Sequence, residues 1–238
     1  NARELFDATV QEVFGGAQPT WRTETLQYLL DNNWIEGHLD GNHGSDYPRK
    51  EEFVSSGVPY ISANCIDGEE VNLDRAKYLS HERAARIRKG VAGDGDVLFA
   101  HNATVGPVAM LKTKEPKVIL GTSLTYYRCN RSQILPEYLT HYMRSPLFRR
   151  QYELIMGQST RNQVPITKQR EFTHVVPPLS VQREIATRLD GLDDERRLLE
   201  GAYEAKLQRL AELKQVLLGR AFAGQLLPGS ADLPEAAE

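Results

Sequence analysis

Apolar residues recur at alternating steps of four and three along the last quarter of the chain, which is the pattern of a coiled-coil helix. The stripe consists of Ile185, Leu189, Leu192, Leu199, Tyr203, Leu210, Leu213 and Leu217, with Arg196 and Lys206 at the seam positions between them. Ser180, after two prolines, is a suitable N-cap, and Gly224 predicts the end of the helix. Residues 180–224 are therefore predicted to form one long spacer helix, and residues 225–238 a disordered tail.

A helix of this length cannot bury its apolar stripe by itself. At ~1.5 Å per residue, roughly forty residues form a rod of ~60 Å, far longer than a core helix of a small domain. Gly191 and Gly201 weaken the helix by up to ~1 kcal/mol each relative to alanine. Because packing has to make up for this weakness, the pattern predicts a partner for the stripe.

The start of the chain repeats a spacing found at the end of the long helix. A Glu-Leu pair followed by Phe and Gly at fixed distances spans residues 4–16 and recurs over residues 212–224. Residues 2–14 also have helical periodicity. We therefore predict that residues 1–18 are the end of a preceding helix of the same kind, so that the chain is half of a tandem protein or a half-length relative of one.

Between these helices, residues 19–179 contain short strand-like runs separated by turn residues. Strands are predicted at residues 58–62, 96–100, 105–111, 118–120, 124–128 and 172–176. Helices are predicted at residues 23–30, 81–88, 137–143 and 146–155. The predicted fold class is α+β, with a mixed, mostly β globular domain followed by a long α-helix.

Charge is distributed unevenly along the chain. The net charge of −3 argues against a nucleic-acid ligand, because binding to phosphates depends on Lys and Arg. Residues 100–175, however, carry 11 basic and 4 acidic side chains, whereas residues 1–75 carry 5 basic and 14 acidic ones. A basic middle between acidic ends is compatible with a DNA-binding surface and also with an ordinary solvated face.

The composition argues against a membrane or secreted protein. The apolar runs are far shorter than the ~18 residues of a membrane span, and no basic-then-apolar signal precedes the first domain. Cys65 and Cys129 have no CxxC partner and are too few for a disulfide framework or a Cys-based zinc site. We interpret both as small buried apolar residues and expect a cytoplasmic protein.

The segment at residues 35–48 is rich in Gly, His and Asp, and two interpretations of it remain open. His38, Asp40, His43 and Asp46 would be the ligands in a metal-dependent nuclease. Turn chemistry accounts for the Gly, Asn and Asp residues equally well, and Asn42 or His43 would then donate to a phosphate or a base edge.

Other signs of catalysis are weak. The glycines of residues 90–96 lack the lysine and the strand-then-helix context of a phosphate-binding loop, so a hairpin turn is the better interpretation. No S-adenosylmethionine or nucleotide site is visible, and Ser45 and Ser159 have no His and Asp at informative spacing. We expect no catalytic residue, no cofactor and no metal on this chain.

A polar segment at residues 157–163 has the composition of a base-reading loop. Its Arg161, Asn162 and Gln163 side chains have flat, forked polar groups that match guanine or adenine in the major groove. The segment lies within the basic middle of the chain. An ordinary surface loop at the end of a helix would have the same composition.

Several segments together resemble the specificity subunit of type I restriction-modification enzymes. They are residues 35–48, similar to the family's Ile-x-Asp-Gly-x-His-Gly turn; residues 95–99 followed by Gly106; residues 135–139; residues 157–162; residues 175–185, similar to the Pro-Leu-x-x-Gln-x-x-Ile start of the family's long helix; and residues 219–226 at the end of that helix. Family members usually carry two recognition domains and two helical regions, so the chain resembles either a fragment of such a subunit or a natural half-subunit.

The resemblance implies a non-catalytic DNA-binding subunit that acts in host defence. Its globular domain would read one half of a bipartite site on double-stranded DNA. Its helix would pair antiparallel with that of a second recognition domain or a second copy of the chain, and so fix the distance between half-sites. The helical region would also dock adenine-N6 methyltransferase subunits, which hold S-adenosylmethionine, and through them the restriction subunits with ATP and Mg.

The polar segments and the basic middle supply the expected DNA contacts. Base readers are expected at Asn42, His43, His101, Asn102, Arg161, Asn162 and Gln163, and phosphate contacts at Arg149, Arg150, Lys168 and Arg170. The alternatives are a metal-dependent nuclease built on residues 38–46 and a coiled-coil adaptor that does not bind DNA.

Overall fold

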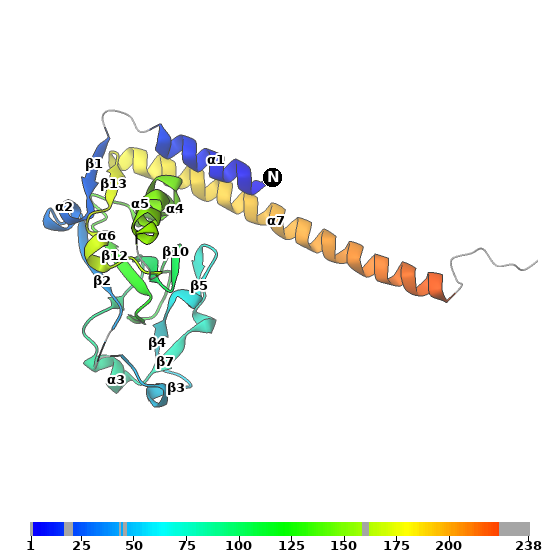
Figure 1. Ribbon diagram of the computed structural model, residues 1–238, viewed down its shortest axis with the longest axis horizontal. Coiled ribbons are helices and arrows are strands. Elements are labelled where there is room, and N and C mark those ends of the chain that lie inside the picture. The colour runs from blue at the N-terminus through cyan, green and yellow to red at the C-terminus, as the bar shows by residue number, and fades with distance from the viewer. Residues whose placement is uncertain (1, 17–20, 43, 45–46, 159–161, 224–238) are drawn as a thin grey trace, which may run out of the picture. The chain divides into compact units, whose positions relative to one another are not determined.

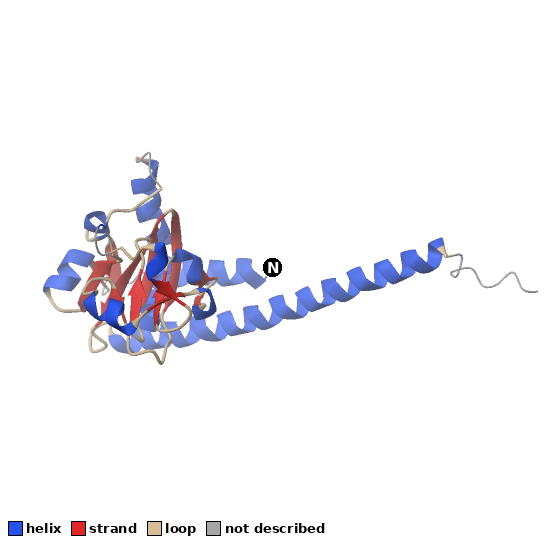
Figure 2. Cartoon of the chain, turned by 90° about the horizontal axis from the view of Figure 1, so that it is seen from below, coloured by secondary structure: helices blue, strands red, loops and turns tan. Residues whose placement is uncertain are grey.

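The computed structural model describes residues 2–16, 21–42, 44, 47–158 and 162–223 (Figure 1). The chain divides into two compact units. The globular unit comprises residues 7–190, and the helical unit comprises residues 1–6 and 191–238. Among the described residues, strands lie only in the globular unit, where helices surround them (Figure 2).

Two larger sheets occupy the centre of the globular unit. The first is antiparallel with the order β10-β9-β12-β2. Its strands are β2 (Ile35–Asp40), β9 (Val97–Asn102), β10 (Thr104–Met110) and β12 (Leu124–Cys129). The second has the order β3-β7-β4-β11-β8, and β11 runs parallel to β4. Its strands are β3 (Phe53–Val54), β4 (Val58–Ile61), β7 (Lys77–Leu79), β8 (Val91–Ala92) and β11 (Val118–Leu120).

Two small antiparallel pairs and a set of helices complete the architecture. The pairs are β1 (Arg22–Thr25) with β13 (Thr173–Val176) and β5 (Ile66–Asp67) with β6 (Glu70–Val71). The α-helices are α1 (Ala2–Gly15), α2 (Leu26–Asp31), α3 (His81–Arg86), α4 (Pro136–Arg144), α5 (Pro146–Gly157), α6 (Ile166–Gln169) and α7 (Leu179–Phe222). Short 3-10 helices are η2 (Lys50–Glu52), η3 (Ala63–Cys65) and η4 (Leu73–Arg75).

Strand β9 is buried on both faces and therefore reads as a continuous apolar run. Leu98 and Ala100 belong to a core cluster that also contains Ile61 of β4 and Leu120 of β11. Phe99 alternates to the other face, where its ring packs edge-on against Phe148 of α5 at 5.6 Å between centroids. The four-stranded sheet is thus fixed between the second sheet and α5, and each fully buried side chain of this size contributes about 1.5–3 kcal/mol.

The last turns of α1 belong to the globular unit, where Phe14 packs into the core. Phe14 is buried, and its ring lies 5.8 Å from that of Tyr138 and 5.5 Å from that of Tyr142, both on α4. Burial also raises the pKa of Tyr142 to about 12, so this tyrosine stays neutral. The predicted helix at residues 2–14 is present, and its repeated phenylalanine is a core residue.

Helix α7 is continuous over 44 residues. It begins at Leu179, one residue before the predicted N-cap. Its first turns belong to the globular unit, where Gln182, Ile185 and Leu189 are buried. The compact globular unit therefore extends to residue 190, beyond the predicted boundary at residue 179. In the part of the chain that is described, no helix combines the length and the apolar content that crossing a bilayer requires.

Three local predictions are corrected. Residues 23–30 do not form a single helix: β1 pairs with β13, and Thr25 then caps α2 through its hydroxyl and the N–H of Tyr28. Residues 35–40, predicted to belong to a glycine-rich loop, form β2 because they pair with β12. Residues 93–96 do turn, but they connect β8 and β9, which lie in different sheets and do not form a hairpin.

Candidate nucleic-acid interface

Segments that were predicted to contact DNA converge at one end of the four-stranded sheet. β9 ends at Asn102, where the chain turns into β10. β12 runs antiparallel to both β9 and β2. The start of β12 and the end of β2 at Asp40 therefore lie at the same end as Asn102. We call this end, together with residues 162–164, the reading end of the sheet.

The β9–β10 turn is hydrogen-bonded to the predicted base-reading loop. Asn102 and Gln163 form an antiparallel β-bridge. The Ala103 N–H donates to the Asn162 carbonyl oxygen at 3.0 Å, and Asn162 Nδ2 donates to the Ala103 carbonyl oxygen at 2.5 Å. Ala103 has a positive φ of 63°, a left-handed conformation that a non-glycine residue holds only when its surroundings fix it. Residues about sixty apart in the sequence therefore form one surface.

His101 lies beneath this surface. It is 1% exposed, and its Nδ1 donates to the Val164 carbonyl oxygen at 3.0 Å. The Val164 N–H donates in return to the His101 carbonyl oxygen at 2.8 Å. The prediction that His101 reads a base is therefore wrong, because a buried imidazole cannot reach a base edge. It supports the residues that lie above it.

Asn42 is also buried, and its predicted role as a base reader is corrected for the same reason. It is 2% exposed, and its Nδ2 donates to the Lys89 carbonyl oxygen at 2.9 Å. Glycines allow the backbone around residue 41 to lie close to the backbone at residues 90 and 121. A Cβ at Gly90 would lie 2.8 Å from the Gly41 Cα, and one at Gly41 would lie 1.9 Å from the Gly121 oxygen. Asn42 thus joins the end of β2 to the segment before β8.

This contact brings to the reading end two cations that composition and spacing did not indicate. Arg88 and Lys89 are exposed and directly precede Gly90. They lie outside the basic window at residues 100–175, and only the packing of Gly90 on Gly41 places them near the end of β2. The signal in the sequence was a pair of basic residues directly before a glycine.

Several predicted residues lie outside the described part of the chain. They are His43 and Arg161 among the expected base readers, Asp46 of the metal-nuclease alternative, and Ser45 and Ser159. The whole of the predicted tail at residues 225–238 lies outside it as well.

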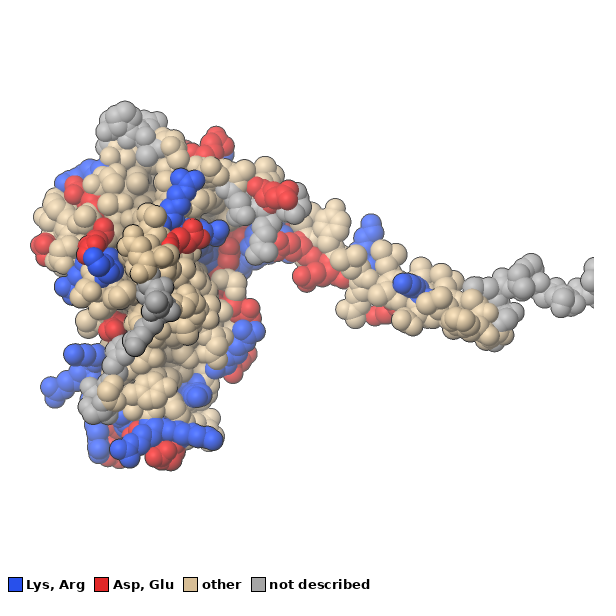
Figure 3. Space-filling view, viewed as in Figure 1, with Lys and Arg blue, Asp and Glu red and all other residues tan. Residues whose placement is uncertain are grey.

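The predicted phosphate contacts are exposed and lie on two helical segments. Arg149 and Arg150 are on α5, which packs on the β9–β10 hairpin: a Cβ at Gly106 would lie 2.9 Å from the Tyr152 hydroxyl. Arg170 and Lys168 lie at α6, and Lys168 pairs with Glu171 at 2.8 Å. On the face drawn in Figure 3, Lys and Arg lie interspersed with Asp and Glu, so the basic middle of the sequence does not form one continuous patch there.

His38, the first proposed ligand of the metal-nuclease alternative, is buried and hydrogen-bonded within the protein. His38 is 4% exposed, and its Nε2 is 3.1 Å from Gln169 Oε1. Burial is the main cause that lowers the pKa of His38 to about 4. Among the residues that the structure describes, no group of three or more His, Cys, Asp and Glu side chains is arranged to hold a metal ion.

The apolar stripe of α7 has two environments. Ile185 and Leu189 are buried within the globular unit, so they do not offer a surface to another helix. Leu192 is half-buried. The remaining stripe residues are exposed large hydrophobics on the helical unit: Leu199, Tyr203, Leu210, Leu213 and Leu217.

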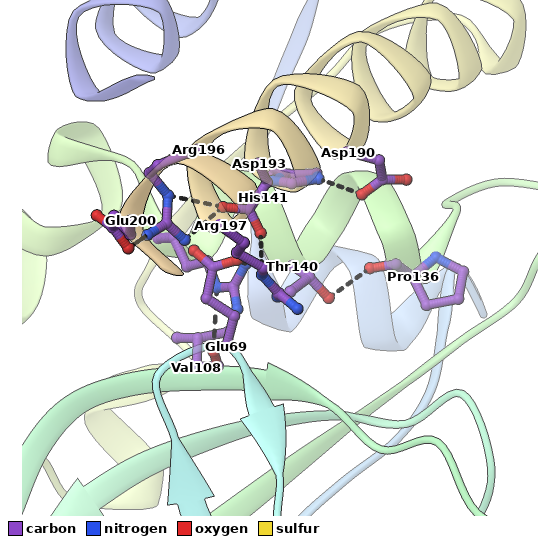
Figure 4. A network of polar contacts seen from close by, with 11 residues as sticks. Glu69, Val108, Pro136, Thr140, His141, Asp190, Asp193, Arg196, Arg197 and Glu200 are labelled. Carbon is purple, nitrogen blue, oxygen red and sulfur yellow. Dashed lines mark hydrogen bonds and ion pairs between the residues drawn. The ribbon is translucent and has the colours of Figure 1, made fainter. Parts of the chain in front are cut away.

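Arg196 occupies a seam position between Leu192 and Leu199 and is held by neighbours within the helical unit. It pairs with Asp193 at 2.5 Å and with Glu200 at 2.7 Å (Figure 4). Its guanidinium lies 5.7 Å from the centre of the Phe6 ring on α1. Within the globular unit the same figure shows His141 of α4 bonded to Asp190 of α7 at 2.8 Å.

Comparison with known proteins identifies similar sequences. The profile of the family described as Type I restriction modification DNA specificity domain matches residues 41–209. The chain is 25% identical over 173 residues to a Methanocaldococcus jannaschii protein named type I restriction enzyme MjaX specificity subunit. That match covers 70% of this chain and 39% of the relative.

Solved structures share the fold. A type I R-M system structure, described for its complex assembly and conformational transition, matches with a TM-score of 0.72 and 22% identity over 94% of this chain and 52% of its own. The HsdS subunit from Thermoanaerobacter tengcongensis matches with a TM-score of 0.61 and 22% identity over 94% and 51%. The S subunit from M. genitalium matches with 0.57 and 15% over 91% and 53%. The predicted α+β fold with a long C-terminal helix is confirmed, and the chain spans about half the length of these structures.

Proposed function

Because the chain belongs to the type I restriction modification DNA specificity domain family, we propose that its globular unit reads one half of a bipartite site on double-stranded DNA. In this proposal α7 holds the globular unit at a set distance from a second recognition unit. The observation that carries the proposal is the convergence of the β9–β10 turn, residues 162–164 and the end of β2 at the reading end.

The reading end has suitable chemistry for base edges. Asn102 and Gln163 are half-buried and held by their backbone bridge. Within the described residues, their side-chain amides form no hydrogen bond with protein, so both groups are available to a ligand. Asn or Gln bonds adenine through two atoms in the major groove, and a rigid backbone limits the entropy lost on binding.

Cations around the reading end would contact phosphates. Arg149, Arg150 and Arg170 are exposed, and we add Arg88 and Lys89 to this group. Lys168 contributes less in this proposal because Glu171 already neutralises it. Phosphate contacts position a protein on DNA, whereas the side chains that reach base edges select the sequence.

The exposed stripe of α7 would pair antiparallel with an equivalent helix of a second recognition unit or a second copy of the chain. Five large apolar side chains on one face of a helix need such a cover. In the proposed complex, methyltransferase subunits dock on the helical region and hold S-adenosylmethionine, while the restriction subunits use ATP and Mg. This chain performs no chemistry itself and acts in the cytoplasm.

The test compares Gln163→Ala with Gln133→Ala in a methyltransferase complex reconstituted on this chain. Gln133 is an exposed glutamine just after β12, at the opposite end of the same sheet. Selection from duplex DNA with randomised central base pairs measures sequence choice. Gln163→Ala should relax choice at one base pair, costing about 1–3 kcal/mol, and Gln133→Ala should leave it unchanged. A complex that enriches no sequence from the pool would refute the proposed function.

A further inference from the structure

Gln169 is a buried glutamine with every hydrogen-bonding position of its side chain in use. It ends α6 and is 0% exposed. Its Oε1 accepts from the Tyr127 hydroxyl at 3.0 Å and from His38 Nε2 at 3.1 Å. Its Nε2 donates to Thr125 Oγ1 at 3.1 Å and to the Val164 carbonyl oxygen at 3.2 Å. A primary amide has two donor hydrogens and two acceptor lone pairs, so this residue is fully satisfied.

The chemistry of the partners fixes the orientation of this amide. A backbone carbonyl can only accept, so the atom that faces Val164 O must be the amide nitrogen. The oxygen then faces His38, whose Nε2 must carry the proton. Burial keeps that imidazole neutral by lowering its pKa to about 4. The same four contacts therefore connect β12 and β2 to one carbonyl of the loop.

Val164 passes this constraint on to the reading end. Its carbonyl oxygen also accepts from His101 Nδ1 at 3.0 Å, and its N–H donates to the His101 carbonyl oxygen at 2.8 Å. The residue before it, Gln163, forms the β-bridge with Asn102. One chain of hydrogen bonds thus runs from Gln169 through Val164 to Gln163 and Asn102.

We propose that Gln169 is a positioning residue for DNA sequence choice: it sets the place of residues 162–164 and of Asn102 without touching DNA. The proposal rests on the proposed function and adds a residue to it. A fully buried amide cannot reach a base, so its effect must pass through Val164. Recognition groups need support of this kind to stay in a productive geometry.

The chain supplies a matched control in Gln182. It too is 0% exposed, and its amide accepts from the Leu135 N–H at 2.9 Å and donates to the carbonyl oxygens of Gln133 and Pro177. Its partners lie after β12 and before α7, away from the reading end. Gln169→Met and Gln182→Met therefore remove equivalent buried amides while retaining side-chain length, and both should lower the melting temperature.

Two measurements separate the variants. In the selection from randomised duplex DNA, Gln169→Met should reduce the preference for selected over random sequence about tenfold, the loss of one base contact, while affinity for the random pool and its salt dependence stay unchanged. Gln182→Met should keep the preference of the wild type. In hydrogen exchange without DNA, Gln169→Met should speed the exchange of the backbone amides of residues 162–164, and Gln182→Met should not.

Each outcome decides between distinct ideas. A Gln169→Met variant that keeps wild-type preference, or wild-type exchange at residues 162–164, overturns the positioning role. A wild-type complex with no preference refutes the proposed function, while exchange still tests the loop contact. If Gln169→Met does not fold, Gln169→Glu retains the acceptor for Tyr127 and His38, loses the donor to Val164, and is expected to give the same two results.

Discussion

At the scale of single residues, buried polar side chains hold the reading end in place. Asn42, His101 and Gln169 are hydrogen-bonded in the interior and fix the backbone segments whose exposed neighbours face solvent. Leaving a buried polar group without its partner costs about 1–3 kcal/mol. The interior therefore contributes to function by limiting where Asn102 and Gln163 can lie.

Two buried histidines make stability depend on pH. Burial lowers the pKa of His38 and of His174 to about 4, from an ordinary value of 6.5. Arg170 and His101 also lower the pKa of His38, whereas Asp40 raises it, and His38 in turn lowers the pKa of His174. Between pH 4 and 6.5 the unfolded chain binds protons that the folded chain does not bind, so stability falls as pH falls through this window. Each histidine accounts for up to about 3 kcal/mol.

Urea unfolding at pH 7.5 and pH 4.5 measures this loss. His174→Phe should remove roughly half of the difference between the two pH values, because one of the two buried neutral histidines is lost. His81→Ala, at an exposed position, is the control for loss of a histidine side chain. Equal pH dependence in wild type and His174→Phe would show that His174 is not held neutral.

At the scale of elements, α7 has a buried start and an exposed stripe, and the stripe is the part that is expected to pair with another helix. Leu210 lies on the stripe, whereas Leu198 is also exposed but lies about 120° away around the helix. We expect Leu210→Asp to weaken pairing of α7 about tenfold or more and Leu198→Asp to have little effect, because only the stripe is covered on pairing. Analytical ultracentrifugation of the wild type and both variants measures self-association; a wild type that dimerises together with a Leu210→Asp variant that dimerises equally well would rule out the stripe as the pairing surface.

The glycines of α7 give a second test at this scale. A Cβ at Gly201 meets no atom within 4 Å, so alanine fits there without a clash. Gly201→Ala should stabilise the helix by up to about 1 kcal/mol, seen as a higher melting temperature by circular dichroism. A lower melting temperature would indicate that a partner helix approaches closely at this residue, as only glycine permits.

At the scale of the whole molecule, the proposed function separates sequence choice from spacing. Insertion of one heptad into the exposed part of α7 lengthens the helix by about 10 Å and keeps the stripe in phase, since each residue adds ~1.5 Å. This matches about three base pairs of DNA. Selection with the heptad variant should yield the same half-site at a longer spacing.

Exchange of residues 22–176 for those of a relative should do the reverse: the half-site changes and the spacing stays. Mapping of methylated adenines on a plasmid library by sequencing measures both quantities. A heptad insertion that changes the half-site, or an exchange that changes the spacing, would contradict the division of roles between the two units.

Local patterns determined much of this protein. The four-three spacing of apolar residues predicted α7 to within one residue at its start, because the period of an amphipathic helix is written in consecutive residues. Strand β11 and helices α4 and α5 were also predicted from local runs and proline positions. The segments at residues 101–102 and 162–163 were both predicted to contact DNA, and the fold brings them together through the bridge between Asn102 and Gln163.

Tertiary structure alone decided which of the polar side chains face solvent. His101 and Asn102 are neighbours in sequence, yet one is buried and the other half-buried, because Asn102 is the last residue of β9 and lies at the end of the sheet. The pairing of β1 with β13, of β2 with β12, and of Gly90 with Gly41 joins distant segments, and no local pattern encodes such pairings. Periodicity within the sequence thus determined the elements, whereas contacts between distant residues determined the reading end.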